Sequence, residues 1–440
     1  MSNRSTFLKS FRLLVLVWAC LWSYSEAAEK ADDLPISARM VLAEAGELME
    51  KKAYRRAVET LTEFQGRGKR ITKLDEPDPQ GYHHPMIYYF LGNCYLLQKN
   101  YPQAEKALLQ AVTRDPGFVE VWVNLAKTYH EQQSYRKAAQ CFATAYEKSD
   151  QSTPDNLYCC AVGYLMANET GPSVAAFQRL FENHPDRITM QWREYFVQAL
   201  IAADQPRRAL PLIRKLTEQS SGEGKTKWRE ILLYQYLQLD MRTEALAYAT
   251  ELTRGECATA KWWKALAHVE LSDGRGEEAL AALTIYGYLT PLSTQEKKLW
   301  ADLNLQLNIP ARAVSQYQEI MKDDPNPGTL QNLILAYQKL DRYEEALDQL
   351  ARYAPDAENA DLLMLKADLL YALKRYPEAK DAYRQVAQSK SSKSGQAWLM
   401  AGYAAWWSDD ITAGRHAFKK AAGDSRYRKA ATLAMQQMVR

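Results

Sequence analysis

The sequence predicts an all-α protein, a superhelical solenoid of about 11 helix-turn-helix repeats followed by a capping helix. Three observations predict this fold. A small residue recurs about every 34 positions, large residues lie at helical spacing around a second small residue upstream of it, and prolines fall where helices should begin. Repeats of this kind stack because one hairpin alone cannot bury its apolar face.

The recurring motif is a Tyr, an Ala three residues later and a large residue four positions beyond that Ala. It is clearest in "YPQAEKALLQA" (101–111), "YRKAAQCFATA" (135–145), "YEEALDQLARY" (343–353) and "YPEAKDAYRQV" (376–386). Upstream lie "YYFLGNCY" (88–95), "WVNLAKTY" (122–129) and "LQNLILAY" (330–337), in which large residues surround a small one. Each repeat is therefore predicted to hold a first and a second helix.

We call the small residue of the second helix the marker. The markers are Ala57, Ala104, Ala138, Ser173, Ala209, Ala245, Ala279, Ala313, Ala346, Ala379 and Gly414. The gaps between them are 47, 34, 35, 36, 36, 34, 34, 33, 33 and 35 residues. A small side chain is expected there because helix axes approach to about 8 Å only where no large side chain intervenes.

Five segments follow from the chain order. Residues 1–27 read as a secretory signal, with basic residues, the apolar run "LLVLVWACLW" and the small residues Ser25 and Ala27 before a cleavage point. The others are a first hairpin (28–65), an insertion (66–85) that accounts for the 47-residue gap, a tandem array (86–424) and the capping helix (425–440). The insertion is either a tether or an element that contacts a partner.

The signal segment predicts a periplasmic protein without a membrane-spanning segment after cleavage. Two alternatives remain, an uncleaved segment that anchors the chain in the inner membrane and an outer-membrane lipoprotein attached through Cys20. Five cysteines lie beyond residue 27, without a CxxC pair, so neither a zinc site nor a full set of disulfides is predicted, and one bridge stays open.

Enzyme and nucleic-acid functions are not favoured. Without residues 1–27 the net charge is +1, which argues against an extended phosphate-binding surface and leaves a local basic patch open, and no metal, cofactor or catalytic motif occurs. The "SSGEGKT" at 220–226 has Gln219 where a phosphate-binding loop needs its first glycine, so we expect a turn in which Gly222 and Gly224 stop a helix. His83 and His84 are expected in solvent.

The order of large and small residues resembles the tetratricopeptide repeat over nearly all of the chain after residue 27. The resemblance implies a non-enzymatic scaffold without cofactors, whose first helices line a concave groove that binds proteins or peptides. Trp263 is expected in the core, with Trp262 facing outward. The groove positions carried over from the family are Tyr89, Asn93, Asn124, Lys127, His130, Lys261, Lys264, His268 and Asn332.

Asn124 and Asn332 stand at matched positions and are similar to the asparagines that hold a bound peptide's backbone in such arrays, since an amide can both donate and accept. Lys127 would contact a carboxylate. The C-terminal "AWLMAGYAAWWSDDITAGRHAFKKAA" also resembles periplasmic repeat proteins that accompany TonB–ExbB–ExbD systems. That resemblance implies envelope partners such as TonB, ExbB or ExbD. An outer-membrane assembly, pilus, secretion or polysaccharide-export scaffold is the alternative.

Overall fold

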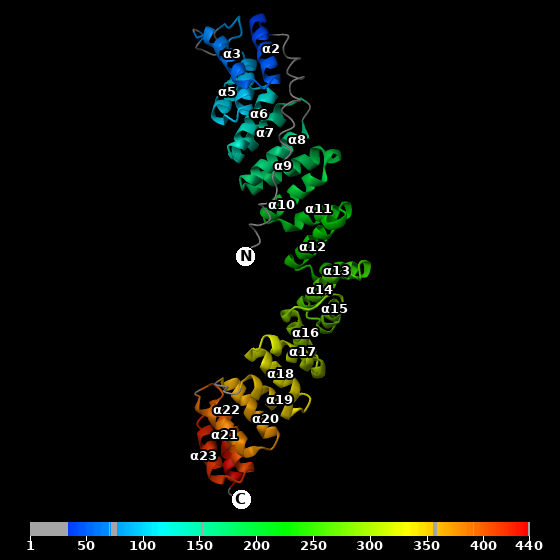
Figure 1. Ribbon diagram of the computed structural model, residues 1–440, viewed down its shortest axis with the longest axis vertical. Helices are drawn as coiled ribbons and strands as arrows, with labels where there is room; N and C mark the ends of the chain where they lie inside the picture. Colours follow the sequence, from blue (N-terminus) through cyan, green and yellow to red (C-terminus); the bar gives the residue numbers. More distant parts are fainter. Residues whose placement is uncertain are drawn as a thin grey trace. The chain divides into compact units, whose positions relative to one another are not determined.

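The computed structural model describes residues 34–69, 71, 77–150, 153–354, 359–389 and 391–438. The predicted signal segment lies outside these residues. Within them the structure is helical and contains no strand, and the chain forms two compact units that divide between Gln235 and Tyr236. Figure 1 shows the helices following one another in chain order.

The helices alternate between first and second members of a hairpin. In the first unit they are α2 (Ile36–Glu50), α3 (Tyr54–Arg67), α4 (Pro85–Leu97), α5 (Tyr101–Arg114), α6 (Val119–Glu131), α7 (Tyr135–Lys148), α8 (Pro154–Met166), α9 (Thr170–Asn183), the short η3 (Pro185–Arg187), α10 (Met190–Ala202), α11 (Pro206–Gln219) and α12 (Gly222–Gln238), which runs past the division.

The second unit continues the alternation. Its helices are α13 (Arg242–Gly255), α14 (Ala260–Ser272), α15 (Gly276–Leu289), α16 (Thr294–Gln306), α17 (Pro310–Asp323), α18 (Pro327–Gln338), α19 (Tyr343–Tyr353), α20 (Ala360–Ala372), α21 (Tyr376–Gln388), α22 (Ser394–Trp407), α23 (Ile411–Ala421) and α24 (Arg428–Gln437). The described residues thus contain eleven hairpins and one final helix, which confirms the predicted fold.

Helices that follow one another pack together throughout α2–α11 and throughout α13–α24. First helices of successive repeats also touch, as α2 with α4, α4 with α6, and α18 with α20. The first helices therefore line the inner face of each unit, and the second helices form its outer face.

The markers explain this close packing. Each of the eleven is buried, and each is the fourth residue of its second helix. The large residue four positions later is buried as well, for example Phe177, Tyr317 and Phe418, each 0% exposed. On the first helix, a Cβ at Gly92 would lie 2.5 Å from Leu108, so that position also needs a minimal side chain.

The turn inside each hairpin has one geometry that the sequence did not reveal. The residue five before every marker has positive φ, and these residues are Lys52, Lys99, Gln133, Asn168, Asp204, Asp240, Gly274, Asn308, Asp341, Lys374 and Asp409. The next residue's N–H then bonds a carbonyl five positions back, as from Asn100 to Tyr95 (2.8 Å). This pair of features is the Schellman motif, which ends a helix by satisfying its last carbonyls.

Replacing Lys99 by Gly is expected to stabilise the protein by up to about 1 kcal/mol, because a left-handed conformation is strained for lysine and free for glycine. Urea unfolding would measure the change. Asn308→Gly is the control and should gain less, since asparagine tolerates this conformation. A loss of stability in Lys99→Gly would contradict the interpretation.

The described part of the insertion between α3 and α4 packs against the first hairpin. Ser37 Oγ donates to the Gln80 carbonyl (2.8 Å), and the Tyr82 ring lies 4.9 Å from that of Phe64. The expectation of two solvated histidines was wrong. Both are half-buried: His83 bonds the Tyr88 hydroxyl (2.9 Å), and the His84 ring accepts from the N–H of Met86 at the start of α4 (3.2 Å).

The expected turn at 220–226 was also partly wrong. Only Ser220 and Ser221 form it, because α12 already begins at Gly222 and includes Gly224. The two extra residues of this repeat lengthen the helix to 17 residues instead of lengthening the loop. The "GKT" is consequently helical and makes no phosphate-binding loop.

The last helix, α24, covers the end of the array as predicted. Its Ala431 and Ala434 are 0% and 2% exposed and belong to one apolar cluster with Phe418 of α23. No helix within the described part of the chain is long and apolar enough to cross a bilayer.

Candidate functional site

Four of the predicted groove residues come together on the inner face of the first unit. Asn124 Nδ2 on α6 donates to Asn93 Oδ1 on α4 (2.7 Å) and to the Tyr89 hydroxyl (3.4 Å). Lys127 Nζ donates to Asn124 Oδ1 (3.3 Å). We call Tyr89, Asn93, Asn124 and Lys127 the inner-face network. It joins the first helices of two successive repeats.

Most side chains of the inner-face network are buried, although they were predicted as positions on the surface of a groove. Tyr89, Asn124 and Lys127 are 3%, 6% and 8% exposed, whereas Asn93 is half-buried. The Tyr89 ring packs 5.0 Å from Phe118, so this residue belongs to the core and only its hydroxyl reaches the network. Asn93 is therefore the most exposed member of the network and the one that a ligand would meet first.

One amide group of the inner-face network can make a further hydrogen bond. Asn93 Nδ2 has no protein partner among the described residues, so this amide can donate to a ligand. Leu97, one turn beyond Asn93 on α4, is 41% exposed. Amide donors, a cation and an apolar side chain thus share one face, a combination that suits an extended polypeptide.

His130 lies beyond the network at the end of α6. Its ring packs 5.4 Å from Tyr135, and its Nδ1 is 3.8 Å from Glu131 Oε1. Its Nε2 is buried without a partner in the described structure. The structure therefore places His130 against its own hairpin and outside the four-residue cluster.

Asn332 makes the equivalent contact in the second unit. Its Nδ2 donates to Asp302 Oδ1 on the preceding first helix (2.9 Å), as Asn124 does to Asn93. Asp302 also accepts from the Tyr317 hydroxyl (2.5 Å) and from Lys298 Nζ (2.8 Å). The matched asparagines thus share one role, which is to bridge neighbouring first helices.

Sequence reasoning missed Asp302 and Tyr317, although the register held a signal. Asp302 lies 11 residues before its marker, the same offset as Asn93 and Lys127. Asp368 has that offset too and accepts from the Tyr383 hydroxyl (2.6 Å). Burial, and then the hydrogen bond to the Asp302 carboxylate, raises the pKa of Tyr317 far above its ordinary value.

The positions predicted in the seventh repeat do not form one cluster. Lys261 and His268 are exposed, and Lys261 Nζ lies 4.9 Å from the centre of the Trp262 ring. The expectation for the tryptophans was wrong, because Trp262 is 1% exposed and Trp263 is half-buried. The core position lies one residue earlier than expected, at 17 before the marker, where Trp192 and Trp228 are also buried.

Lys264 pairs with Glu296 of the next first helix at 2.7 Å. Glu296 also closes a capping box with Ser293 at the start of α16. Burial opposes ionisation of this carboxyl, but the hydrogen bonds from Lys264 and Ser293 outweigh it and lower its pKa to about 2. Lys264 thus stabilises the fold through its ion pair with Glu296, although it was predicted as a groove residue.

Because this pKa is lowered on folding from 4.5 to about 2, the interaction stabilises the protein above pH 4.5 and is lost as the pH falls towards 2. In Glu296→Gln, stability should therefore fall less between these two pH values than in the unmodified protein. Urea unfolding across this window measures the slope. The exposed Glu277, replaced by Gln, is the control, and an unchanged slope in Glu296→Gln would contradict the assignment.

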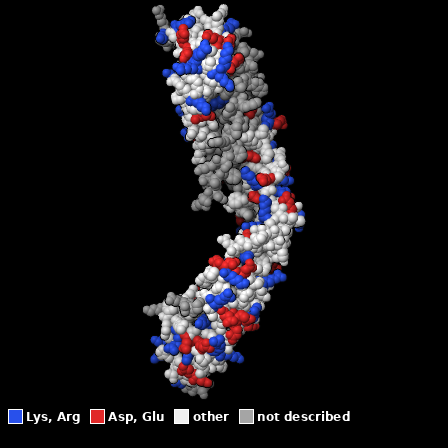
Figure 2. Space-filling view, viewed as in Figure 1, with Lys and Arg blue, Asp and Glu red and all other residues white. Residues whose placement is uncertain are grey.

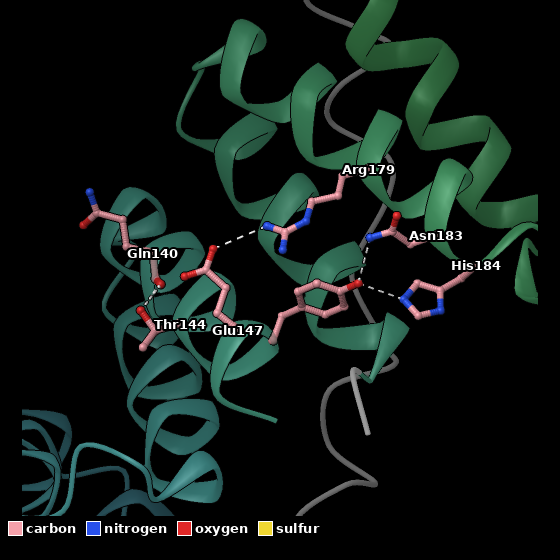
Figure 3. A network of polar contacts seen from close by, with 7 residues as sticks. Gln140, Thr144, Glu147, Arg179, Asn183 and His184 are labelled. Atoms are coloured by element: carbon pink, nitrogen blue, oxygen red, sulfur yellow. Dashed lines mark hydrogen bonds and ion pairs between the residues drawn. The ribbon is translucent and has the colours of Figure 1, made fainter. Parts of the chain in front are cut away.

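The outer face is held by polar bridges between second helices. Arg179 of α9 pairs with Glu147 of α7 (3.3 Å), and the Tyr146 hydroxyl meets His184 Nε2 (3.0 Å) and Asn183 Nδ2 (3.2 Å) (Figure 3). Lys and Arg are intermixed with Asp and Glu on the described surface that Figure 2 shows. Most of this polarity therefore serves solubility and the register between repeats.

Metal-binding side chains do not gather in the described part of the chain. There, no three His, Cys, Asp or Glu side chains come together as metal ligands, and the five cysteines beyond residue 27 are unpaired. Burial raises the pKa of the Cys94, Cys141 and Cys160 thiols to about 12, so they stay protonated at neutral pH.

The fold and this inner face define an α-helical repeat protein of the kind that binds other proteins. Tetratricopeptide-repeat models match residues 85–118, 119–147 and 332–394. These parts of the chain are therefore tetratricopeptide repeats. No curated protein matches the sequence.

Solved structures with similar folds are distant. A tetratricopeptide repeat protein from Parabacteroides merdae is 13% identical over 68% of this chain and 98% of its own, with a TM-score of 0.33. MamA from Desulfovibrio magneticus is 18% identical over 38% and 95%, with a TM-score of 0.33. Naa15/Naa10 bound to HypK-THB is 11% identical over 92% and 79%, with a TM-score of 0.37. Similarities this distant say nothing about the function of this chain.

Proposed function

We propose that this protein is a scaffold that holds an extended segment of a partner protein on the inner face of its first unit. One observation carries the proposal: the inner-face network joins amide and ammonium donors of two successive repeats beside the exposed Leu97. Because these side chains are held by one another, little conformational entropy is lost when they bind.

The network suggests how a segment is held. Asn93 Nδ2 donates to a backbone carbonyl of the partner, Lys127 attracts a carboxylate, and Leu97 contacts an apolar side chain. Such contacts recognise an extended backbone with modest demands on its sequence. The chemistry is binding without turnover.

The location that fits the N-terminal segment is the periplasm, with partners in the cell envelope. The C-terminal resemblance favours TonB, ExbB or ExbD as those partners. N-terminal sequencing of the purified protein tests the location, since cleavage after Ala27 leaves a chain that begins at Ala28.

The partner test is crosslinking and recovery of the tagged full chain from its own cells. The variant Asn93→Ala, Lys127→Met should recover far less of its partners than the unmodified protein. The matched control, Asn183→Ala, Lys148→Met, makes the same changes on second helices and should recover them normally. Equal recovery by the inner-face variant, with unchanged thermal unfolding, would refute the inner-face site. Absence of TonB, ExbB and ExbD among the recovered proteins would contradict their proposal as partners.

A second function rests on Cys20. If this cysteine is lipidated, an outer-membrane scaffold for assembly, secretion or polysaccharide export is favoured over the TonB role. The mass of the purified chain distinguishes the two, because lipidation at Cys20 removes all preceding residues and adds acyl chains.

A further inference from the structure

We propose that the C-terminal end of the array carries a second binding surface, for an acidic segment of a partner protein. It consists of Arg415, Lys419 and Lys420 on α23, and Arg428 and Lys429 on α24. We call these five residues the C-terminal cationic surface. All five are exposed.

The charge of this end differs from that of the rest of the chain. Residues 411–440 carry seven Lys and Arg against one acid, a net charge of +6. Residues 28–410 carry 46 Lys and Arg against 51 Asp and Glu, a net charge of −5. Each of the other ten second helices holds at least one Asp or Glu, whereas α23 holds none.

The neighbouring acids do not neutralise the surface. Asp410 pairs with Lys380 (2.9 Å) and caps α23 through the N–H of Ala413 (3.1 Å). Asp424 pairs with Arg426 (2.7 Å). Among the described residues, the side chains of Arg415, Lys419, Lys420 and Lys429 have no hydrogen-bond or ion-pair partner.

Helix stability accounts for only two of the five cations. Lys419 and Lys420 lie in the last turn of α23, where they complement the helix dipole. Arg428 and Lys429 occupy the first two positions of α24, where the dipole disfavours positive charge. Arg415 lies in the middle of α23. The helix dipole therefore gives no reason for the cations at Arg415 and Lys429, which a binding role explains.

The two helices present their charges together. Arg428 Nε donates to the carbonyl of Ala422 at the end of α23 (3.1 Å), which sets the first turn of α24 beside the last turn of α23. Arg415 and Lys419 are four residues apart and share one side of α23. The cations therefore form one surface across the end of the array.

An acidic polypeptide fits this surface better than a membrane or a nucleic acid. A helix that binds the membrane surface needs an apolar face turned outward, but Ala431 and Ala434 of α24 face the core and Leu433 alone is an exposed large apolar residue of that helix. Nucleic acid is bound through long rows of phosphate contacts, and this surface is confined to two short helices. Five cations suit a short run of carboxylates, to which the two arginines can bind bidentately.

The test measures the fluorescence anisotropy of fluorescein-labelled octaglutamate titrated with the full chain. The variant replaces Arg415, Lys419, Lys420 and Lys429 by Gln and leaves Arg428 bonded to Ala422. The control variant makes the same net charge change at Arg56, Lys106, Lys148 and Lys215, which are exposed on second helices of the first unit. We expect the first variant to weaken binding by about tenfold or more and the control by less than about twofold.

Several results would overturn the proposal. They are no binding of octaglutamate at low salt, an equal loss in both variants, or tighter binding of phosphatidylglycerol vesicles or duplex DNA through the same four residues. Thermal unfolding shows whether the variants are folded, and Arg415→Gln, Lys429→Gln provides a milder second variant. The inner-face variant Asn93→Ala, Lys127→Met should bind octaglutamate normally, so this surface and the inner-face site can fail separately.

Discussion

Replacing Phe177 by Ala is expected to lower the free energy of unfolding by about 3 to 5 kcal/mol. Phe177 is 0% exposed and stands four residues after the marker Ser173. Its ring stacks 5.4 Å from Phe196 of the next repeat and lies 6.3 Å from Tyr158 of its own first helix. Truncation would leave a cavity where α8, α9 and α10 meet, because close-packed helices relax only partly around a lost side chain.

Phe181→Ala provides the matched control. It removes the same side chain from the same helix one turn later, where the ring is half-buried and contacts Phe196 at 4.9 Å. Urea unfolding followed by circular dichroism should show a clearly larger loss for Phe177→Ala. Equal losses would contradict the role assigned to the position four residues after the marker.

Replacing the marker Ala138 by Leu is expected to lower the free energy of unfolding by about 1 to 3 kcal/mol, or to unfold its repeat locally. Ala138 is 1% exposed and packs in the same apolar cluster as Leu125 and Phe142. The added atoms would push α7 away from its neighbours, since the cluster has no room for them.

Gln140→Leu is the control for this change. Gln140 lies on the same helix and is exposed. Its substitution should stay within about 0.5 kcal/mol. Hydrogen exchange of α6 and α7 should quicken in Ala138→Leu alone, and similar exchange in the two variants would contradict close packing at the marker.

The sequence predicted the hairpins well because their packing depends on residue size at fixed spacing. All eleven markers are buried at the predicted place. The left-handed turn residue went unnoticed because Lys, Gln, Asn, Asp and Gly all occupy it, so no single residue type signals it. The buried tryptophan was assigned to the wrong position because Trp262 and Trp263 are adjacent. Periodicity cannot decide which of two neighbouring large apolar residues faces the core.

The site was predictable in its members but not in its contacts. Asn124 could be identified by its match with Asn332, but its partner Asn93 is set by the stagger between successive first helices. That stagger depends on how two repeats pack, which the pattern within one repeat does not contain. The burial of Lys127 follows from the same packing.

The most direct measurement of the central claim is photo-crosslinking in living cells with benzoylphenylalanine placed at Leu97 or at Leu109 of the full chain. The two leucines are 41% and 39% exposed, the first on the inner face in α4 and the second on a second helix, α5. The inner-face site predicts crosslinks to partner proteins from position 97 that disappear in Asn93→Ala, Lys127→Met, and none from position 109. Partner crosslinks from 109 alone, or crosslinks from 97 that survive those substitutions, would contradict it.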